Sequence, residues 1–173
     1  MSYNNFLYLL NDALSNHDIS LALDSVKTFK AADLADILAQ LPLENSQKLL
    51  LNLPARAYVF SYLKPEEQVK FAQVLTRIDL AEIMGEMPSD KRVDLFKCLD
   101  HEQQNALLPA LAQAEREDIR QLSSYVEGTA GAIMSSEYAT LKPKMTVAEA
   151  FKAIRLEAPD TETIYLSYVL DDD

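Results

Sequence analysis

Pairs of acidic residues spaced by one helical turn are the residues of this sequence with the clearest capacity for chemistry. The pairs are Asp90/Asp94, Asp33/Asp36 and Asp79/Glu82. Residues three or four positions apart lie on the same face of an α-helix, so each pair would present two carboxylates side by side. Mg²⁺ is a hard ion that keeps several waters and takes one or two carboxylates from a protein surface. Each pair is therefore a candidate contact for a divalent cation.

The same acids also have a purely structural explanation. A carboxylate in the first turn of a helix is favoured by the helix dipole, typically by about 0.3–1 kcal/mol. Ser89 precedes Asp90 as a candidate N-cap. Asp33/Asp36 and Asp79/Glu82 stand near helix starts, and we interpret them mainly as solvated, dipole-favoured residues. Asp90 and Asp94 directly precede the apolar Leu95 and remain open to either interpretation.

A ten-residue segment that occurs twice, called here the repeated phrase, indicates the helices that position these acids. DLADILAQLP at residues 33–42 returns as DLAEIMGEMP at residues 79–88, an offset of 46. Both copies place apolar residues at relative positions 0, 3, 4 and 7, which is one face of an α-helix. Pro42 and Pro88 end one helix and open the next, since proline fits the first turn of a helix but not its interior.

The repeat predicts a run of short paired helices. Pro65 lies midway between Pro42 and Pro88, so each copy of the repeat divides into two halves. The expected helices are 3–15, 18–30, 33–41, 44–53, 55–63, 65–76, 79–87, 89–99, 102–112 and 115–125. Short amphipathic helices stacked in pairs form a superhelical solenoid, in which each pair buries its apolar face against its neighbours. The predicted fold class is therefore mainly α.

After Tyr125 the pattern changes to a small α/β unit. Two of the three glycines lie in EGTAGAIM (127–134), which indicates a linker or a close backbone approach. Strands are expected at Tyr138–Leu141 and Thr163–Leu170, on either side of a helix at Val147–Arg155 that begins with a Thr146/Glu149 capping box. We therefore divide the chain into a helical domain (1–126), a junction (127–137) and a strand–helix–strand fragment (138–173).

Composition narrows the possible partners. The formal net charge is −11, which argues against binding to nucleic acid or to anionic membranes, and favours cations or basic partners. The alternative is that the charge only keeps the protein soluble. No apolar run approaches the roughly 20 residues needed to span a bilayer, and the N-terminus lacks the features of a signal peptide. We expect a soluble, intracellular chain. The single cysteine, Cys98, is expected to be a buried structural thiol on an apolar helical stripe.

The sequence predicts no enzyme. His17 and His101 are far apart in sequence and have no cysteine or HExxH companion, so zinc binding is not expected. The chain contains no GxGxxG, GxxxxGK[ST] or GxSxG motif, and no serine or tyrosine with a paired base.

The order of motifs from Tyr125 onward resembles the MgtE family of magnesium transporters, in its cytoplasmic N-terminal region. The resemblance rests on the repeated phrase, on the Leu-Pro pairs at helix boundaries, and on two segments of the C-terminal part. These are YVEGTAGAIMSSEYATLKPKMTVAEAFKAIR and EAPDTETIYLSYVLDDD. Across both segments, the glycine-rich junction, Met134, TVAEA and ETIYLSYV follow one another in an order that resembles the start of a CBS domain in that family.

The resemblance implies a right-handed superhelical domain followed by a CBS pair and a transmembrane pore, in a homodimer. It implies that Mg²⁺ bridges acidic faces of the helical and CBS domains and holds a closed state, which opens when Mg²⁺ is scarce. Asp90 and Asp94 match positions that supply acids to this interface in the family, and are our predicted metal ligands. Tyr58 and Val59 stand where relatives carry an acid. Carboxylates also accept Co²⁺ or Mn²⁺.

The resemblance places the chain in the cytoplasm, as part of a transporter in the inner or plasma membrane, with the rest of that transporter as its partner. The alternative is a helical-repeat scaffold that binds a protein and has no metal role, since superhelices of short helices also resemble parts of flagellar motor switch proteins. The acidic end Asp171–Asp173 is expected to be a solvated turn.

Overall fold

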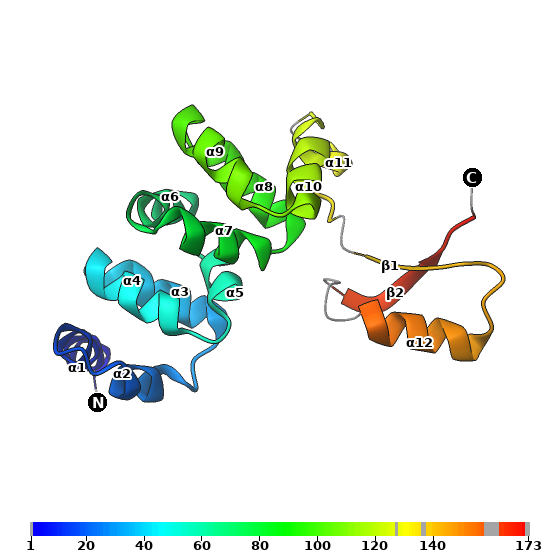
Figure 1. Ribbon diagram of the computed structural model, residues 1–173. Coiled ribbons are helices and arrows are strands. Elements are labelled where there is room, and N and C mark those ends of the chain that lie inside the picture. The colour runs from blue at the N-terminus through cyan, green and yellow to red at the C-terminus, as the bar shows by residue number, and fades with distance from the viewer. Residues whose placement is uncertain (1, 127, 136–137, 158–162, 172–173) are drawn as a thin grey trace.

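The computed structural model describes residues 2–126, 128–135, 138–157 and 163–171, and is mainly helical (Figure 1). The first part contains α1 (Tyr3–Ser15), α2 (Ile19–Val26), α3 (Ala31–Gln40), α4 (Leu43–Asn52), α5 (Arg56–Ser61), α6 (Pro65–Val74), α7 (Arg77–Gly85), α8 (Ser89–Cys98), α9 (His101–Leu107), the 3₁₀ turn η1 (Leu108–Ala110) and α10 (Gln113–Ser123). The second part contains α11 (Ala130–Ile133), β1 (Tyr138–Leu141), α12 (Val147–Glu157) and β2 (Thr163–Val169).

The helices of the first part stack in two rows, with alternate helices in contact. One row runs α3–α5–α7–α9 and the other α2–α4–α6–α8–α10, with α1 packed on α2 and α4 at one end. Figure 1 shows this stack as a continuous progression from α1 and α2 to α10. In a stack of paired helices, each helix contacts the helix two places later in the chain as well as its sequence neighbour. The observed contacts follow this pattern. The mainly helical fold is therefore confirmed.

A buried apolar residue follows almost every helix of the stack. These residues are Leu41, Leu53, Leu63, Leu75, Met87, Leu99 and Leu111. Their spacing along the chain is constant, except for a shorter step between Leu53 and Leu63. Leu41, Leu53 and Met87 each precede a proline, which disfavours the helical conformation for the preceding residue and so ends the helix there. Burying a leucine side chain contributes roughly 1.5–3 kcal/mol, so each junction also anchors the stack.

Polar side chains donate a second hydrogen bond to carbonyl groups near the helix ends, which also accept a backbone hydrogen bond from the amide three positions later. In four places a side chain donates a hydrogen bond to the carbonyl oxygen eight positions earlier, near the end of the preceding helix. The pairs are Ser46 Oγ to Leu38 O (2.7 Å), Gln68 Nε2 to Phe60 O (3.0 Å), Arg92 Nε to Met84 O (2.7 Å) and Gln104 Nε2 to Phe96 O (2.9 Å). Ser46 and Arg92 occupy equivalent positions after the two copies of the repeated phrase. The repeat therefore retains a hydrogen-bonding position as well as an apolar face.

Arg92 makes the most extensive of these contacts. Its side chain is buried, and besides Met84 its Nη2 atom donates to the carbonyl oxygens of Gly85 (3.3 Å) and Met87 (2.8 Å). Its Nη1 atom pairs with Asp118 Oδ2 on α10 at 2.8 Å. One side chain thus holds the end of α7, the start of α8 and the middle of α10 together. Sequence spacing does not predict this role.

The junction predicted as a linker contains the short helix α11. Gly131 in α11 lies against the ring of Tyr125, and a Cβ atom at this glycine would overlap the Tyr125 Cδ1 atom. Gly128 has a φ of +81°, a conformation that glycine adopts without strain. The expectation of a close backbone approach is confirmed at Gly131.

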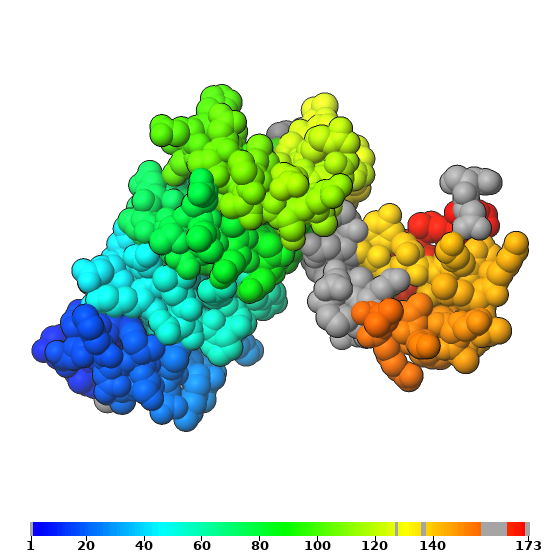
Figure 2. Space-filling model, in the orientation of Figure 1, coloured from blue at the N-terminus to red at the C-terminus, as the bar shows by residue number. Residues whose placement is uncertain are grey.

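The C-terminal unit consists of two parallel strands with α12 packed against β1. Figure 2 shows this unit as a smaller lobe beside the helical stack. The predicted capping box is confirmed: Thr146 N donates to Glu149 Oε2 at 2.8 Å, and Glu149 N donates to Thr146 Oγ1 at 3.3 Å. The first hydrogen bond is the main cause of a lowered pKa at Glu149. The solvated turn expected at the C-terminal end lies mostly outside the described residues, because only its first member, Asp171, is described.

One expectation about α8 was wrong. Cys98 is exposed rather than buried. It follows Asp94 by one turn and shares its solvent-facing side, whereas Arg92, Val93, Leu95 and Leu99 occupy the buried side. Among the described residues, no helix combines the length and apolarity needed to cross a membrane.

Replacing Arg92 with methionine is expected to destabilise the protein by about 3 kcal/mol, because it removes a buried ion pair to Asp118 and the hydrogen bonds to three carbonyl groups. Chemical denaturation measures the change. The matched control is Arg120→Met, since Arg120 pairs with Glu117 on the exposed face of α10, where solvent screens the pair and its loss should cost little stability. Equal losses in the two variants would contradict the role assigned to Arg92.

Replacing Gly131 with alanine is expected to weaken the docking of α11, because the added Cβ overlaps the Tyr125 ring. The Ala132 amide, which donates to Thr129 O at 3.1 Å, should exchange its hydrogen faster. In a Tyr125→Ala background the same substitution should have little further effect. If it accelerates exchange equally in both backgrounds, the ring contact is not the cause.

Candidate metal site

The start of α8 places Asp90 in its first turn. Pro88 occupies the N-cap position, with an extended ψ of 141°, and the helix begins at Ser89. Ser89 is therefore the first helical residue rather than the expected N-cap. Its side chain is fully buried, and its Oγ atom lies 3.3 Å from Ser135 Oγ, in the segment that leads to β1. The acidic end of α8 thus lies beside the place where the chain leaves the helical stack.

The structure brings Asp90 and Asp94 together on one side of α8. The ammonium of Lys91 lies between them, 3.4 Å from Asp90 Oδ2 and 3.9 Å from Asp94 Oδ2. The side chains are 21% exposed for Asp90 and 58% exposed for Asp94, so the pair is open to solvent on one side.

One carboxylate oxygen of Asp90 is available to bind a water molecule or a cation. Within the described part of the chain, Asp90 Oδ1 is buried and accepts no hydrogen bond. A buried charged acceptor without a partner is costly, so a water molecule or a cation at this oxygen would stabilise the site. The burial of this oxygen is a feature of the pair that residue spacing does not predict.

The site offers only part of a coordination shell. The described residues contain no group of three or more His, Cys, Asp or Glu side chains placed to hold a metal ion. Two carboxylates on an exposed helix face fit an ion that keeps most of its waters, as Mg²⁺ does. They do not fit zinc, which takes four closely arranged nitrogen or sulfur ligands in its structural sites.

The acids of the second copy of the repeated phrase are engaged in structural contacts. Asp79 forms a reciprocal pair with Thr76 at the start of α7: its backbone N donates to Thr76 Oγ1 at 3.1 Å, and its Oδ2 accepts from Thr76 Oγ1 at 2.6 Å. Glu82 pairs with Arg56 of α5 at 2.8 Å. The interpretation of Asp79 as a helix-start residue is confirmed.

Tyr58 and Val59 on α5 provide no carboxylate. Val59 is buried in the core, and Tyr58 is exposed, with its hydroxyl 3.0 Å from that of Tyr62. This hydrogen bond is the main cause of a raised pKa at Tyr58. The side chain therefore stays neutral near pH 7 and is a poor ligand for a hard cation.

Lys91 and Glu115 are residues that the sequence analysis did not single out. Lys91 is the immediate competitor of any cation at the acidic pair. Glu115 lines a cavity of about 440 Å³ between α7 and α10, where its Oε2 atom is buried and accepts no hydrogen bond from the described residues. Both features depend on side-chain directions that spacing alone does not fix.

Similarity to known proteins agrees with this architecture. The family described as "MgtE intracellular N domain" matches residues 29–128. The magnesium transporter MgtE of Thermus thermophilus is 32% identical over 168 residues, which cover 94% of this chain and 37% of that protein. The magnesium transporter MgtE of Enterococcus faecalis is 39% identical over 57 residues, 33% of this chain and 13% of that protein. This chain thus spans little more than a third of the first of these relatives.

Two solved structures share the fold. One is a crystal structure of the soluble part of a magnesium transporter, with a TM-score of 0.85 and 26% identity over 99% of this chain and 68% of the other. The second is the cytosolic domain of the Mg²⁺ channel MgtE in complex with ATP, with a TM-score of 0.85 and 32% identity over 96% of this chain and 69% of the other. The family match covers more than half of the chain, and the chain belongs to the MgtE intracellular N domain family.

Proposed function

We propose that the chain is a cytosolic, non-enzymatic part of a magnesium transporter that senses Mg²⁺. The observation that carries the proposal is the Asp90/Asp94 pair, exposed on one side of α8 with an unpartnered carboxylate oxygen, in a chain whose relatives are named magnesium transporters. Asp90 and Asp94 are the proposed ligands. Mg²⁺ is the proposed ion, and Co²⁺ or Mn²⁺ would use the same oxygen donors.

The proposed mechanism is electrostatic. A Mg²⁺ ion at Asp90 and Asp94 would bridge to acidic groups of the CBS part, and so neutralise repulsion between two negatively charged surfaces. The net charge of −11 makes this repulsion strong when the ion is absent. The hydrogen bond between Ser89 and Ser135 lies next to Asp90, so an ion there would act close to the connection between the two parts.

The proposed partner is the remainder of the same transporter, comprising a complete CBS pair and a membrane pore in a homodimer. The division into a helical domain (1–126), a junction (127–137) and a CBS fragment (138–173) is part of this proposal. Phe151 and Leu156 on α12 and Val169 on β2 are exposed apolar side chains that further CBS elements would cover. A sheet of two strands also gains stability from additional elements packed on it.

Titration with Mg²⁺ at millimolar concentrations is expected to shift the amide NMR signals of residues 90–94. Asp90→Asn combined with Asp94→Asn should weaken binding by about tenfold or more, since both ligand charges are removed. The matched control is Asp33→Asn combined with Asp36→Asn, which removes the same charge from the exposed acidic pair of α3. Equal weakening in the control, or no shift at α8 in the wild type, would refute the proposed ligands.

Lys91→Met is expected to raise the affinity for Mg²⁺ by about two- to fivefold, because the ammonium that competes for both carboxylates is removed. Isothermal titration calorimetry measures the change. Lys70→Met is the control, because it changes the net charge of the protein by the same amount. Lys70 also pairs with a carboxylate, that of Glu67, but on α6 and away from the acidic pair of α8. An equal gain in both variants would indicate an effect of net charge, without local competition at α8.

A further inference from the structure

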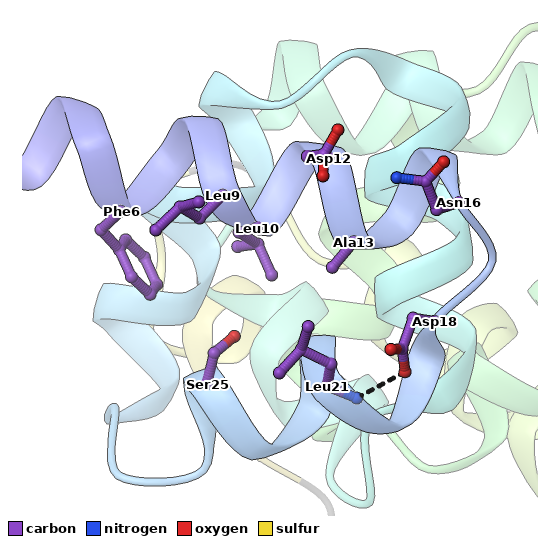
Figure 3. Close-up of a pocket in the computed structure, with 9 residues that line it drawn as sticks. All are labelled: Phe6, Leu9, Leu10, Asp12, Ala13, Asn16, Asp18, Leu21 and Ser25. Carbon is purple, nitrogen blue, oxygen red and sulfur yellow. Dashed lines mark hydrogen bonds between the residues drawn. The ribbon is translucent and has the colours of Figure 1, made fainter.

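A groove between α1 and α2 is an uncovered apolar feature at the end of the stack. It has a volume of about 340 Å³ and is lined by Phe6, Leu9, Leu10, Asp12, Ala13, Asn16, Asp18, Leu21 and Ser25. Figure 3 shows Leu10 and Ala13 of α1 facing Leu21 and Ser25 of α2, with the Asp12 carboxylate on the side of α1 away from α2 and the rest of the stack behind them. All of the lining residues belong to α1, α2 or the turn between them, so the groove faces away from α3 and α4.

The walls of the groove are apolar and exposed. Leu10 and Ala13 are buried and form its floor, whereas Leu9 and Leu21 are 45% and 57% exposed. The Phe6 ring closes one end and is fixed by stacking on Phe29, with the ring centroids 5.3 Å apart. The turn at the other end is also well defined, since Asp18 Oδ1 accepts a hydrogen bond from Leu21 N at 3.0 Å. The groove is thus preformed.

The position of the groove in the stack indicates the shape of its occupant. Within the stack, the inner helices of each row have a helix on both sides, whereas α1 and α2 have such neighbours only on the side of α4. Terminal repeats of solenoid proteins normally carry a polar outer face, because that face remains in water. Here the outer face instead presents leucines, so an added helix would continue the packing already present between the pairs.

Charge indicates the chemistry of the occupant. The lining includes Asp12 and Asp18 and no basic residue. A second copy of the chain, placed by a two-fold axis, would bring these aspartates toward their own equivalents, in a molecule of net charge −11. A helix with Lys or Arg beside its apolar face would instead complement them.

We propose that the α1–α2 groove is a docking site for an amphipathic helix of a partner protein, which inserts apolar side chains between Leu9 and Leu21 and directs basic side chains toward Asp12 and Asp18. Such helices anchor through residues at positions i, i+3 or i+4, and i+7. This site is separate from the acidic pair of α8 and does not require Mg²⁺.

The test uses two synthetic Ala-based helical peptides with leucines at i, i+4 and i+7, one with flanking lysines and the other with flanking glutamates. In NMR titrations of the full chain, the lysine peptide should shift signals of α1 and α2, and the glutamate peptide should bind at least about tenfold more weakly. Leu21→Ser and Asp12→Lys should each weaken the lysine peptide by about fivefold or more.

Ile78→Ser is the matched control, because Ile78 on α7 is 66% exposed and lies outside the groove. It should leave the affinity unchanged. The proposal would be overturned if neither peptide shifts α1 and α2 at millimolar concentration, or if both peptides bind equally well. Sedimentation of the wild type as a dimer that Leu21→Ser dissociates would also overturn it, since a second copy would then be the occupant.

Discussion

The stack depends on hydrogen bonds between a polar side chain and a carbonyl group near the end of the preceding helix. Near the ends of α3, α5 and α7, one carbonyl group accepts a backbone hydrogen bond from the amide three positions later and has a second lone pair for a side-chain donor. Ser46, Gln68 and Arg92 each donate to such a carbonyl from the following helix. The chain can therefore turn sharply without exposing its core, and the buried residue at each junction fills the space left at the corner.

This arrangement also orients the candidate metal site. Arg92 lies between Asp90 and Asp94 in sequence, and its burial against α7 and α10 places the two acids on the opposite side of α8, where Asp94 is exposed and Asp90 is partly buried. The contact that stabilises the helix pair thus presents the carboxylates, while Lys91 limits how strongly they attract a cation. In the proposed function, the stack acts as a rigid arm and α8 as its ion-responsive surface.

The sequence predicted the elements well where local signals were strong. Prolines and the repeated phrase located the helices from α3 to α8 closely at most ends, and the expected strand Tyr138–Leu141 has the observed bounds. Features that depend on tertiary contacts were missed. Cys98 was placed on the wrong side of α8, and the roles of Arg92 and Lys91 were not foreseen, because periodicity cannot tell which neighbour a polar side chain meets. The pairing of Asp90 with Asp94 followed from spacing, but the buried oxygen of Asp90 did not.

The central claim is that α8 presents Asp90 and Asp94 together as a cation site. Crystals of the chain soaked in Mn²⁺, an ion that accepts the same oxygen ligands and gives an anomalous signal, test it most directly. We expect an anomalous peak at coordination distance from both carboxylates, with the Lys91 ammonium displaced from its position between them. Peaks only at other acidic residues, with Lys91 still between Asp90 and Asp94, would contradict it.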